Sequence, residues 1–172
     1  MVFVPCIIAS SSAVPSHAQD PPAPFKRYTI EDGMPANFVV SLLQDDQGYL
    51  WIGTTDGVCR FDGTDFVTYA SDARVPGRII YQIFQANDSL LLLATSSGLA
   101  VFEERHERYR NELITDTLLR VGSGIATVSI ARATDRRILV SGGYALHLLD
   151  RDLRSIARNR VYDKPTFIPN FM

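Results

Sequence analysis

The sequence predicts an all-β fold assembled from repeated four-stranded units, and three observations carry this prediction. The chain repeats without a gap at an offset of 41 residues, so that Met34–Phe61 aligns with Val75–Phe102. The segments inside each repeat are short, apolar and β-branched, and none shows the long 3.6-residue periodicity of a helical repeat. Asp and Gly separate these segments at the spacing of tight hairpin turns. A period of about 40 residues with these features is typical of a β-propeller blade.

The first unit contains a leading segment followed by four strands. Phe25–Ile30 is expected to form a short strand, and Glu31–Asn37 a loop in which Gly33 takes a positive φ and Pro35 fixes the return of the chain. The four strands are predicted at Phe38–Gln44, Tyr49–Thr54, Val58–Phe61 and Asp65–Tyr69. Each of the three turns between these strands contains Asp and Gly, as tight hairpins require.

The second unit repeats this order, and the third follows it loosely. Strands of the second unit are predicted at Ile79–Gln85, Leu90–Thr95, Leu99–Phe102 and near Glu107–Tyr109. Those of the third are predicted at Ile125–Ala131, Ile138–Val140 and Ala145–Leu149. Beyond Arg151 the pattern fades, and Tyr162–Met172 is long enough to start a strand but not to complete a blade.

Three units are too few to close a ring. Closed propellers typically have about four to eight blades, and closure is what protects their strand edges. The predicted fold is therefore a partial β-propeller of about three four-stranded blades from a larger ring. We interpret the chain as the N-terminal piece of a longer protein or the product of a truncated gene.

The two ends of the sequence differ in composition. Residues 1–18 combine an apolar stretch with the small residues of Ser16-His17-Ala18, which predicts a signal peptide cleaved after Ala18. Unlike most signal peptides, this segment has no Lys or Arg before the apolar stretch. The alternative interpretation of residues 1–18 is a disordered N-terminal tail. Residues 19–24 form a Pro-rich spacer, and residues 25–172 form the incomplete propeller.

Overall composition excludes several classes of protein. The chain has 172 residues, of which 46% are hydrophobic and 21% charged, with a formal net charge of −2, as in ordinary soluble domains. Its arginines are scattered rather than clustered, which argues against a nucleic-acid partner. No apolar stretch has the length of a membrane span. After signal cleavage Cys59 is the only cysteine, so no internal disulfide is expected.

The block Gln44–Gly63 (QDDQGYLWIGTTDGVCRFDG) is the densest motif in the chain. It resembles the two-component regulator propeller repeat, whose blades read roughly D-x-x-G-x-L-W-[IF]-G-T-x-x-G-[LV], and Glu31–Asn37 resembles the E-D-G-L-P-x-N start of that family's first blade. The second unit matches partly, because Leu92 and Ala94 stand where the first has Trp51 and Gly53. The resemblance spans roughly Phe25 to Leu149 and implies a larger, seven-bladed ring.

The motif residues all have structural interpretations. Asp45 and Gly48 frame a hairpin, and Trp51 fills space between adjacent blades. Gly53 permits the close approach of a neighbouring sheet. Thr54 can hydrogen-bond toward the turn that ends at Gly57. The strongest motif in the chain is therefore a folding motif, and its residues do not indicate a catalytic or binding activity.

No catalytic, metal or cofactor site is predicted. The adjacent carboxylates Asp45 and Asp46 lack the spacing of a calcium loop. His106 and His147 have no third ligand beside them. Ser123 resembles a nucleophile elbow only as far as Gly-Ser-Gly, and Cys59 is expected to be a small packed side chain.

In the family that the chain resembles, such propellers form the periplasmic sensor region of membrane-anchored regulators, often hybrid histidine kinases. The resemblance implies a non-enzymatic segment that binds a carbohydrate or another small ligand, with the rest of the propeller as a partner and a possible homodimer of the complete receptor. The alternatives are a propeller enzyme of the lyase or hydrolase class and a secreted interaction scaffold. Because strand direction alternates, Asn37 and Asp56 are expected on one face, opposite the Asp45–Gly48 turn, as candidate ligand contacts.

Overall fold

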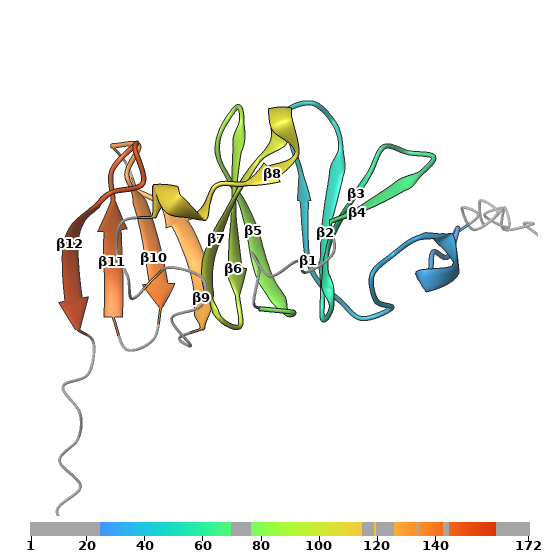
Figure 1. Cartoon of the computed structure of the whole chain (residues 1–172), viewed down its shortest axis with the longest axis horizontal. Helices are drawn as coiled ribbons and strands as arrows, with labels where there is room; N and C mark the ends of the chain where they lie inside the picture. The colour runs from blue at the N-terminus through green and yellow to red at the C-terminus, as the bar shows by residue number, and fades with distance from the viewer. Residues whose placement is uncertain are drawn as a thin grey trace, which may run out of the picture.

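The computed structural model describes residues 25–69, 77–114, 119, 126–133, 135–142 and 145–160. The predicted signal peptide and spacer, Ser123 and Tyr162–Met172 lie outside the described residues. Within the described part, three four-stranded antiparallel sheets stand side by side as three blades (Figure 1). The first strands of neighbouring sheets lie beside each other, and the strand order within each sheet follows the sequence. The predicted partial propeller is confirmed.

Each blade consists of four strands in order. Blade 1 contains β1 (Val39–Gln44), β2 (Leu50–Thr54), β3 (Gly57–Phe61) and β4 (Phe66–Tyr69). Blade 2 contains β5 (Ile80–Asn87), β6 (Leu90–Thr95), β7 (Gly98–Glu103) and β8 (Arg108–Tyr109). Blade 3 contains β9 (Thr127–Arg132), β10 (Ile138–Gly142), β11 (Ala145–Leu149) and β12 (Ser155–Arg160). Three short 3₁₀ helices accompany them: η1 (Ile30–Asp32), η2 (Glu104–His106) and η3 (Asn111–Leu113).

The second hairpin turns of blades 1 and 2 are built identically. The Thr54 hydroxyl donates to the Gly57 carbonyl oxygen at 2.9 Å and accepts from the Asp56 amide at 3.0 Å. Thr95 does the same with Gly98 and Ser97, at 2.8 and 3.1 Å. Both glycines have positive φ, so another residue would be strained there. The 41-residue repeat therefore describes real structural equivalence.

The predicted strand at Phe25–Ile30 is wrong. Residues 25–29 are irregular, and Ile30 begins η1, where the Thr29 hydroxyl caps the Glu31 amide and Asp32 accepts from the Thr29 amide. The Tyr28 ring packs against Phe61 and Phe66, with centroids 5.0 and 5.3 Å away. Tyr28 thus packs on the outer face of blade 1, whereas Phe25 and Ile30 are exposed, and the segment pairs with no strand of the described residues.

The fourth strand of blade 3, β12, was not predicted. It follows a turn in which the Asp150 carboxylate accepts from the amides of Asp152 and Arg154, both at 2.9 Å. The first turn of blade 1 is built in the same way, because Asp45 accepts from Gln47 and Tyr49. Leu153, with a φ of 62°, stands where blade 1 has Gly48. Without that glycine the turn is not recognisable in the sequence.

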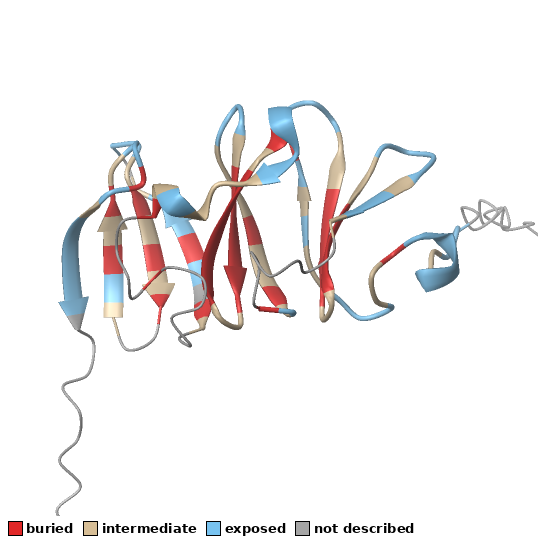
Figure 2. Ribbon diagram, in the orientation of Figure 1, coloured by how far each residue is buried: buried red, intermediate tan, exposed pale blue. Residues whose placement is uncertain are grey.

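Blade 2 is buried on both faces, blade 1 is buried toward blade 2 and partly covered on its outer face by the leading segment, and blade 3 is covered on one face (Figure 2). Alternate residues of β6 point to opposite sides, so that Leu91 and Leu93 pack toward blade 1, and Leu92 and Ala94 toward blade 3. This double burial explains why β6 and β7 are continuous apolar runs rather than alternating ones.

Trp51 anchors the seam between blades 1 and 2. Its indole ring is 1% exposed, stacks on Tyr69 at 5.5 Å between centroids and meets the edge of Phe102 at 5.4 Å. The indole Nε1 donates to Asp45 Oδ2 at 2.7 Å, which satisfies the one polar atom of the ring. The predicted space-filling role of Trp51 is therefore accompanied by a hydrogen bond that fixes its orientation.

Gly53 allows the two blades to approach closely, as predicted. A Cβ atom placed there would lie 2.9 Å from Ile80 Cγ2 on the first strand of blade 2. Ser41, the cross-strand partner of Gly53, donates from its hydroxyl to the Ile80 carbonyl oxygen at 3.2 Å. Any larger residue at position 53 would push the blades apart.

The outer faces of the array expose apolar side chains. On the blade 1 side, Phe38, Val39 and Leu42 are 68%, 41% and 60% exposed. On blade 3, Leu146 and Ile156 are 39% and 49% exposed. Met34, Ile52 and Cys59 form a small cluster on the outer face of blade 1, where the leading segment covers part of the sheet. Side chains of this size on the end sheets are suited to contact with further blades.

We expect Trp51→Ala to destabilise the fold by about 3–5 kcal/mol, because it removes a fully buried ring and leaves a cavity. Trp51→Phe should cost less, since it keeps an aromatic ring but leaves the buried Asp45 Oδ2 without its indole donor. Chemical denaturation of both variants measures the two effects, with Leu42→Ala as the control because Leu42 is exposed. An unchanged midpoint for Trp51→Ala would show that the seam does not depend on this ring.

Candidate functional site

The two edges of the blade array carry different loops (Figure 1). We call the lower edge the one with the β2–β3 and β6–β7 turns and the leading loop Glu31–Asn37. The upper edge carries the β1–β2, β5–β6 and β11–β12 turns. The opposite placement of the Asp45–Gly48 and Thr55–Gly57 turns follows directly from the alternation of strand direction.

At the lower edge, the leading loop forms an open hollow of about 510 Å³ whose lining includes Arg27, Glu31 and Asn37. The side-chain Oδ1 of Asn37 accepts from the Ile30 amide at 2.9 Å. Asn37 therefore both shapes the loop and reaches a surface that a ligand could contact.

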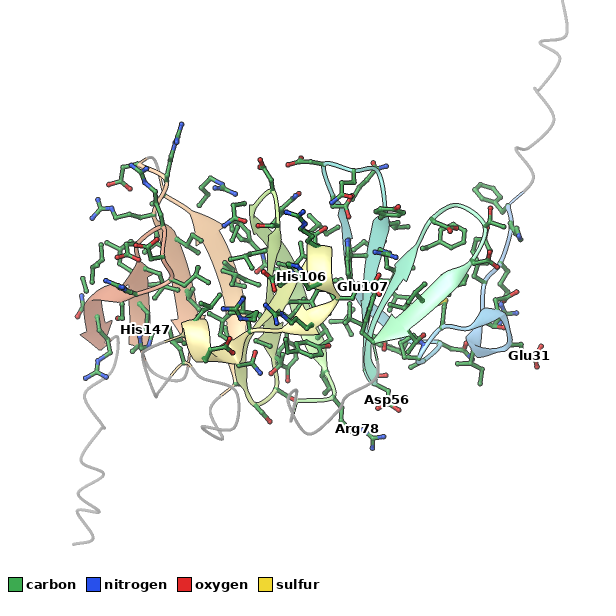
Figure 3. All side chains as sticks on the ribbon, turned by 45° about the horizontal axis from the view of Figure 1, so that its top comes forward. Glu31, Asp56, Arg78, His106, Glu107 and His147 are labelled. Atoms are coloured by element: carbon green, nitrogen blue, oxygen red, sulfur yellow. The ribbon has the colours of Figure 1, made fainter. Side chains whose placement is uncertain are left out.

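Asp56, the second candidate residue at this edge, is engaged in an ion pair between blades. Its two carboxylate oxygens accept from Arg78 Nε at 2.7 Å and Nη2 at 3.2 Å (Figure 3). The Gly57 amide adds a main-chain link by donating to the Arg78 carbonyl oxygen at 2.8 Å. Asp56 does not line the hollow beside Asn37. The Asp56 side chain therefore links blades 1 and 2 through Arg78.

At the upper edge, a hollow of about 590 Å³ lies between the turns of all three blades. Blade 3 contributes three arginines to its lining, Arg132, Arg136 and Arg151, whereas Asp46 and Asp88 contribute carboxylates from blades 1 and 2. The hollow is thus positively charged on the blade 3 side and negatively charged on the other. Sequence analysis did not identify it, because its arginines come from separate turns and look scattered along the chain.

Arg132 is held rigidly at the seam of blades 2 and 3. Its guanidinium lies over the Phe84 ring, 5.2 Å from the centroid, and Nη2 donates to the Gln85 carbonyl oxygen at 2.6 Å. Next to it, Gln82 of β5 makes two hydrogen bonds with the main chain of Ile130 in β9, at 2.7 and 2.8 Å. These contacts fix the position of blade 3 relative to blade 2.

A second hollow on the upper edge, of about 510 Å³, lies between blades 1 and 2. Glu104 lines it and is 6% exposed, and its Oε1 has no hydrogen-bond partner among the described residues. Burial and the neighbouring carboxylate of Asp45 raise the pKa of Glu104 to about 7, an effect that Arg60 only partly offsets. A carboxyl group that titrates near neutral pH therefore lies at the seam where Trp51 is anchored.

The other titratable candidates remain separate. His106 in η2 lies 3.2 Å from Glu103, and His147 is buried in β11 of another blade (Figure 3). Burial raises the pKa of the Cys59 thiol to about 11, as expected for a packed side chain. Among the described residues, no group of three or more His, Cys, Asp or Glu side chains is arranged to hold a metal ion. No helix in the described part is long and apolar enough to cross a membrane.

The chain is similar to known regulators in sequence. Residues 33–56 match the sequence model of the family described as two component regulator propeller. The histidine kinase P4 of Formosa agariphila is 38% identical over 66 residues, which are 38% of this chain and 5% of that protein.

Two solved structures from B. thetaiotaomicron share the architecture. The extracellular domain of the putative hybrid two component system BT3049 has a TM-score of 0.61 and 24% identity, over 82% of this chain and 20% of that one. The extracellular domain of the putative one component system BT4673 has a TM-score of 0.60 and 14% identity, over 75% of this chain and 17% of that one. At these identities the likeness shows the fold alone.

The fold and the repeat thus define a partial β-propeller. Within it, residues 33–56 match the two component regulator propeller model, which confirms the resemblance drawn from the motif. The chain spans about one fifth of the structural relatives and one twentieth of the curated kinase.

Glu104→Gln should make folding stability less dependent on pH. Because the pKa of Glu104 is raised in the folded state to about 7, its contribution to stability is fully present below its ordinary pKa of 4.5 and is lost as the pH rises through 7. The glutamine variant should be more stable than the parent at pH 8, by up to about 3 kcal/mol, and gain nothing at pH 4. Melting curves across this range measure the effect. Glu31→Gln, at an exposed carboxyl group, is the control, and equal gains at both pH values would contradict the assignment.

Proposed function

We propose that this chain is an N-terminal part of the extracytoplasmic, ligand-sensing propeller of a two-component-type signalling receptor. The observation that carries the proposal is the match of residues 33–56 to the regulator propeller repeat in a chain whose three blades superpose on extracellular domains of such systems. The exposed apolar side chains on blades 1 and 3 support the continuation of the ring on both sides. The receptor would be anchored in the inner membrane and carry a histidine kinase or another output domain.

The proposed segment is a non-enzymatic binding module. A propeller enzyme of the lyase or hydrolase class requires convergent carboxylates or a metal cluster on the loops. The pair that comes closest, Asp45 and Glu104, lies at the blade seam, where Asp45 is occupied by Gln47, Tyr49 and Trp51 as hydrogen-bond donors. This arrangement serves packing. We therefore favour ligand sensing over catalysis, with a carbohydrate or another small extracytoplasmic molecule as the ligand and a homodimer as the receptor's assembly.

Export can be tested directly. If residues 1–18 are a signal peptide, the chain expressed from Met1 in a Gram-negative host should be recovered from the periplasm with Gln19 as its first residue. Intact-mass analysis of periplasmic and cytoplasmic fractions measures this. Replacing Ala18 with a bulky residue should block processing. Full-length protein confined to the cytoplasm would contradict the proposed location.

The lower edge offers a test of ligand contact. In the complete receptor, Asn37→Ala should weaken the response to ligand, because Asn37 lines an open hollow. Asp56→Ala should do the same while lowering stability by no more than about 1 kcal/mol, since the ion pair with Arg78 is exposed. Dose–response curves and melting temperatures separate the two effects, with Asp65→Ala as the control, because Asp65 is exposed and does not line any of the three hollows. An unchanged response in both Asn37→Ala and Asp56→Ala would contradict ligand contact at the lower edge.

A further inference from the structure

We propose that the upper-edge hollow between blades 2 and 3 binds a small polyhydroxylated ligand through its anionic group, with Arg132, Arg136 and Arg151 as the anion-binding side chains. This inference rests on the proposed sensing function and specifies the ligand class. It adds a contact at the upper edge to the lower-edge contact that Asn37→Ala and Asp56→Ala test. The hollow has a volume of about 590 Å³, which is within the range of small-molecule sites.

The first argument is the uncompensated positive charge on the blade 3 side. In the described part of the chain, no carboxylate forms an ion pair with Arg132, Arg136 or Arg151. Several other arginines are paired, namely Arg137 with Asp135, Arg110 with Glu103 and Glu112, and Arg60 with Glu107, whereas Arg105 beside the second upper-edge hollow is not paired with any described carboxylate. Three arginines that line one hollow without partners are an electrostatic site for an anion, and the guanidinium fork matches carboxylate and sulfate oxygens.

The second argument is the fixed position of Arg132. Its contacts with the Phe84 ring and the Gln85 carbonyl oxygen hold the guanidinium in place before any ligand arrives. Nη1 also donates to the Ala86 carbonyl oxygen at 3.4 Å, and the other N–H groups are available to an acceptor, since a guanidinium carries five donors. A preorganised donor loses little side-chain entropy on binding, which favours specific recognition over a diffuse charge effect.

The third argument concerns the residues around Arg132. Gln85 lines the same hollow, and its buried side-chain Nε2 has no hydrogen-bond partner in the described residues. Arg136 has a φ of 65°, a left-handed conformation that Gly or Asn adopts at lower cost. The turn geometry therefore does not explain why an arginine stands there. If the Gln85 side chain turned toward the hollow, a ligand acceptor would satisfy its buried amide while the anionic group met the Arg136 guanidinium.

The two carboxylates determine what else the ligand carries. Asp46 and Asp88 line the hollow from blades 1 and 2, so a simple anion would meet repulsion on that side. Hydroxyl groups would instead donate to these carboxylates while the anionic group meets the arginines. The hollow is thus complementary to a molecule that has an anionic group at one end and hydrogen-bond donors at the other.

The test is calorimetric titration of the 172-residue chain at low salt with three sugars that share a hydroxylated ring. Glucuronate carries a carboxylate, glucose 6-sulfate carries a sulfate ester, and glucose carries no charge. We expect at least one charged sugar to bind at least tenfold more tightly than glucose, with an affinity that falls as salt is added. The stronger of the two charged sugars identifies the preferred anionic group.

The variant Arg136→Gln with Arg151→Gln should weaken that binding at least tenfold. The matched control is Arg154→Gln with Arg158→Gln, which removes the same charge from exposed positions that do not line the hollow. All four side chains are exposed, so circular dichroism should show unchanged folding. Equal binding of glucose and the charged sugars, no binding of either charged sugar, or equal losses in both double variants would overturn the proposal. A receptor that responds to ligand regardless of Arg136 and Arg151 would overturn it while leaving the proposed sensing function intact.

Discussion

The hydrogen bond between the Trp51 indole and Asp45 is the constraint on which the upper edge depends. One carboxylate oxygen of Asp45 accepts hydrogen bonds from the amides of Gln47 and Tyr49, which closes the first turn. The other oxygen accepts a hydrogen bond from Trp51 Nε1. The same carboxylate therefore fixes a hairpin and orients the ring that separates two blades. Because Asp45 is committed in this way, the Glu104 carboxyl group of blade 2 meets a fixed neighbour with a negative charge, which contributes to its raised pKa.

Much of the fold could be predicted from the repeat, because equivalent residues of blades 1 and 2 make the same turn hydrogen bonds. Thr54 and Thr95 are 41 residues apart and make the same bonds, and Gly53 is small because Ile80 lies against it. The strand predictions failed where the residue types depart from the repeat. Leu153 in a left-handed conformation concealed the turn before β12. In Phe25–Ile30 the apolar or aromatic residues alternate with polar ones only loosely, and a pattern of this length cannot be distinguished from a strand although Tyr28 alone packs on blade 1.

The candidate sites were less predictable than the fold. Strand alternation correctly placed the Asp45 and Asp56 turns on opposite edges, since this follows from chain direction alone. The arginine hollow requires knowledge of which turns meet in space, and its residues do not occupy one repeated position. Arg132 ends β9, Arg136 lies in the following turn, and Arg151 lies in the turn before β12. The available signal was the number of arginines in the third unit, because pairing is visible only in the structure.

The two seams of the array are tied differently, and this difference bears on sensing. Ser41 and Gln82 occupy equivalent positions in the repeat and both reach across to the next blade. Ser41 makes one hydrogen bond, with the Ile80 carbonyl oxygen, whereas Gln82 makes two with the Ile130 main chain. Arg132 adds a further tie across the second seam. A ligand bound between the blade 3 arginines and the β5–β6 turn would add polar contacts across the second seam. It would therefore stabilise one position of blade 3 relative to blade 2. Because a ligand shifts a conformational equilibrium only by its differential affinity, a site that spans a seam can bias the blade arrangement in a way that contacts within one blade cannot.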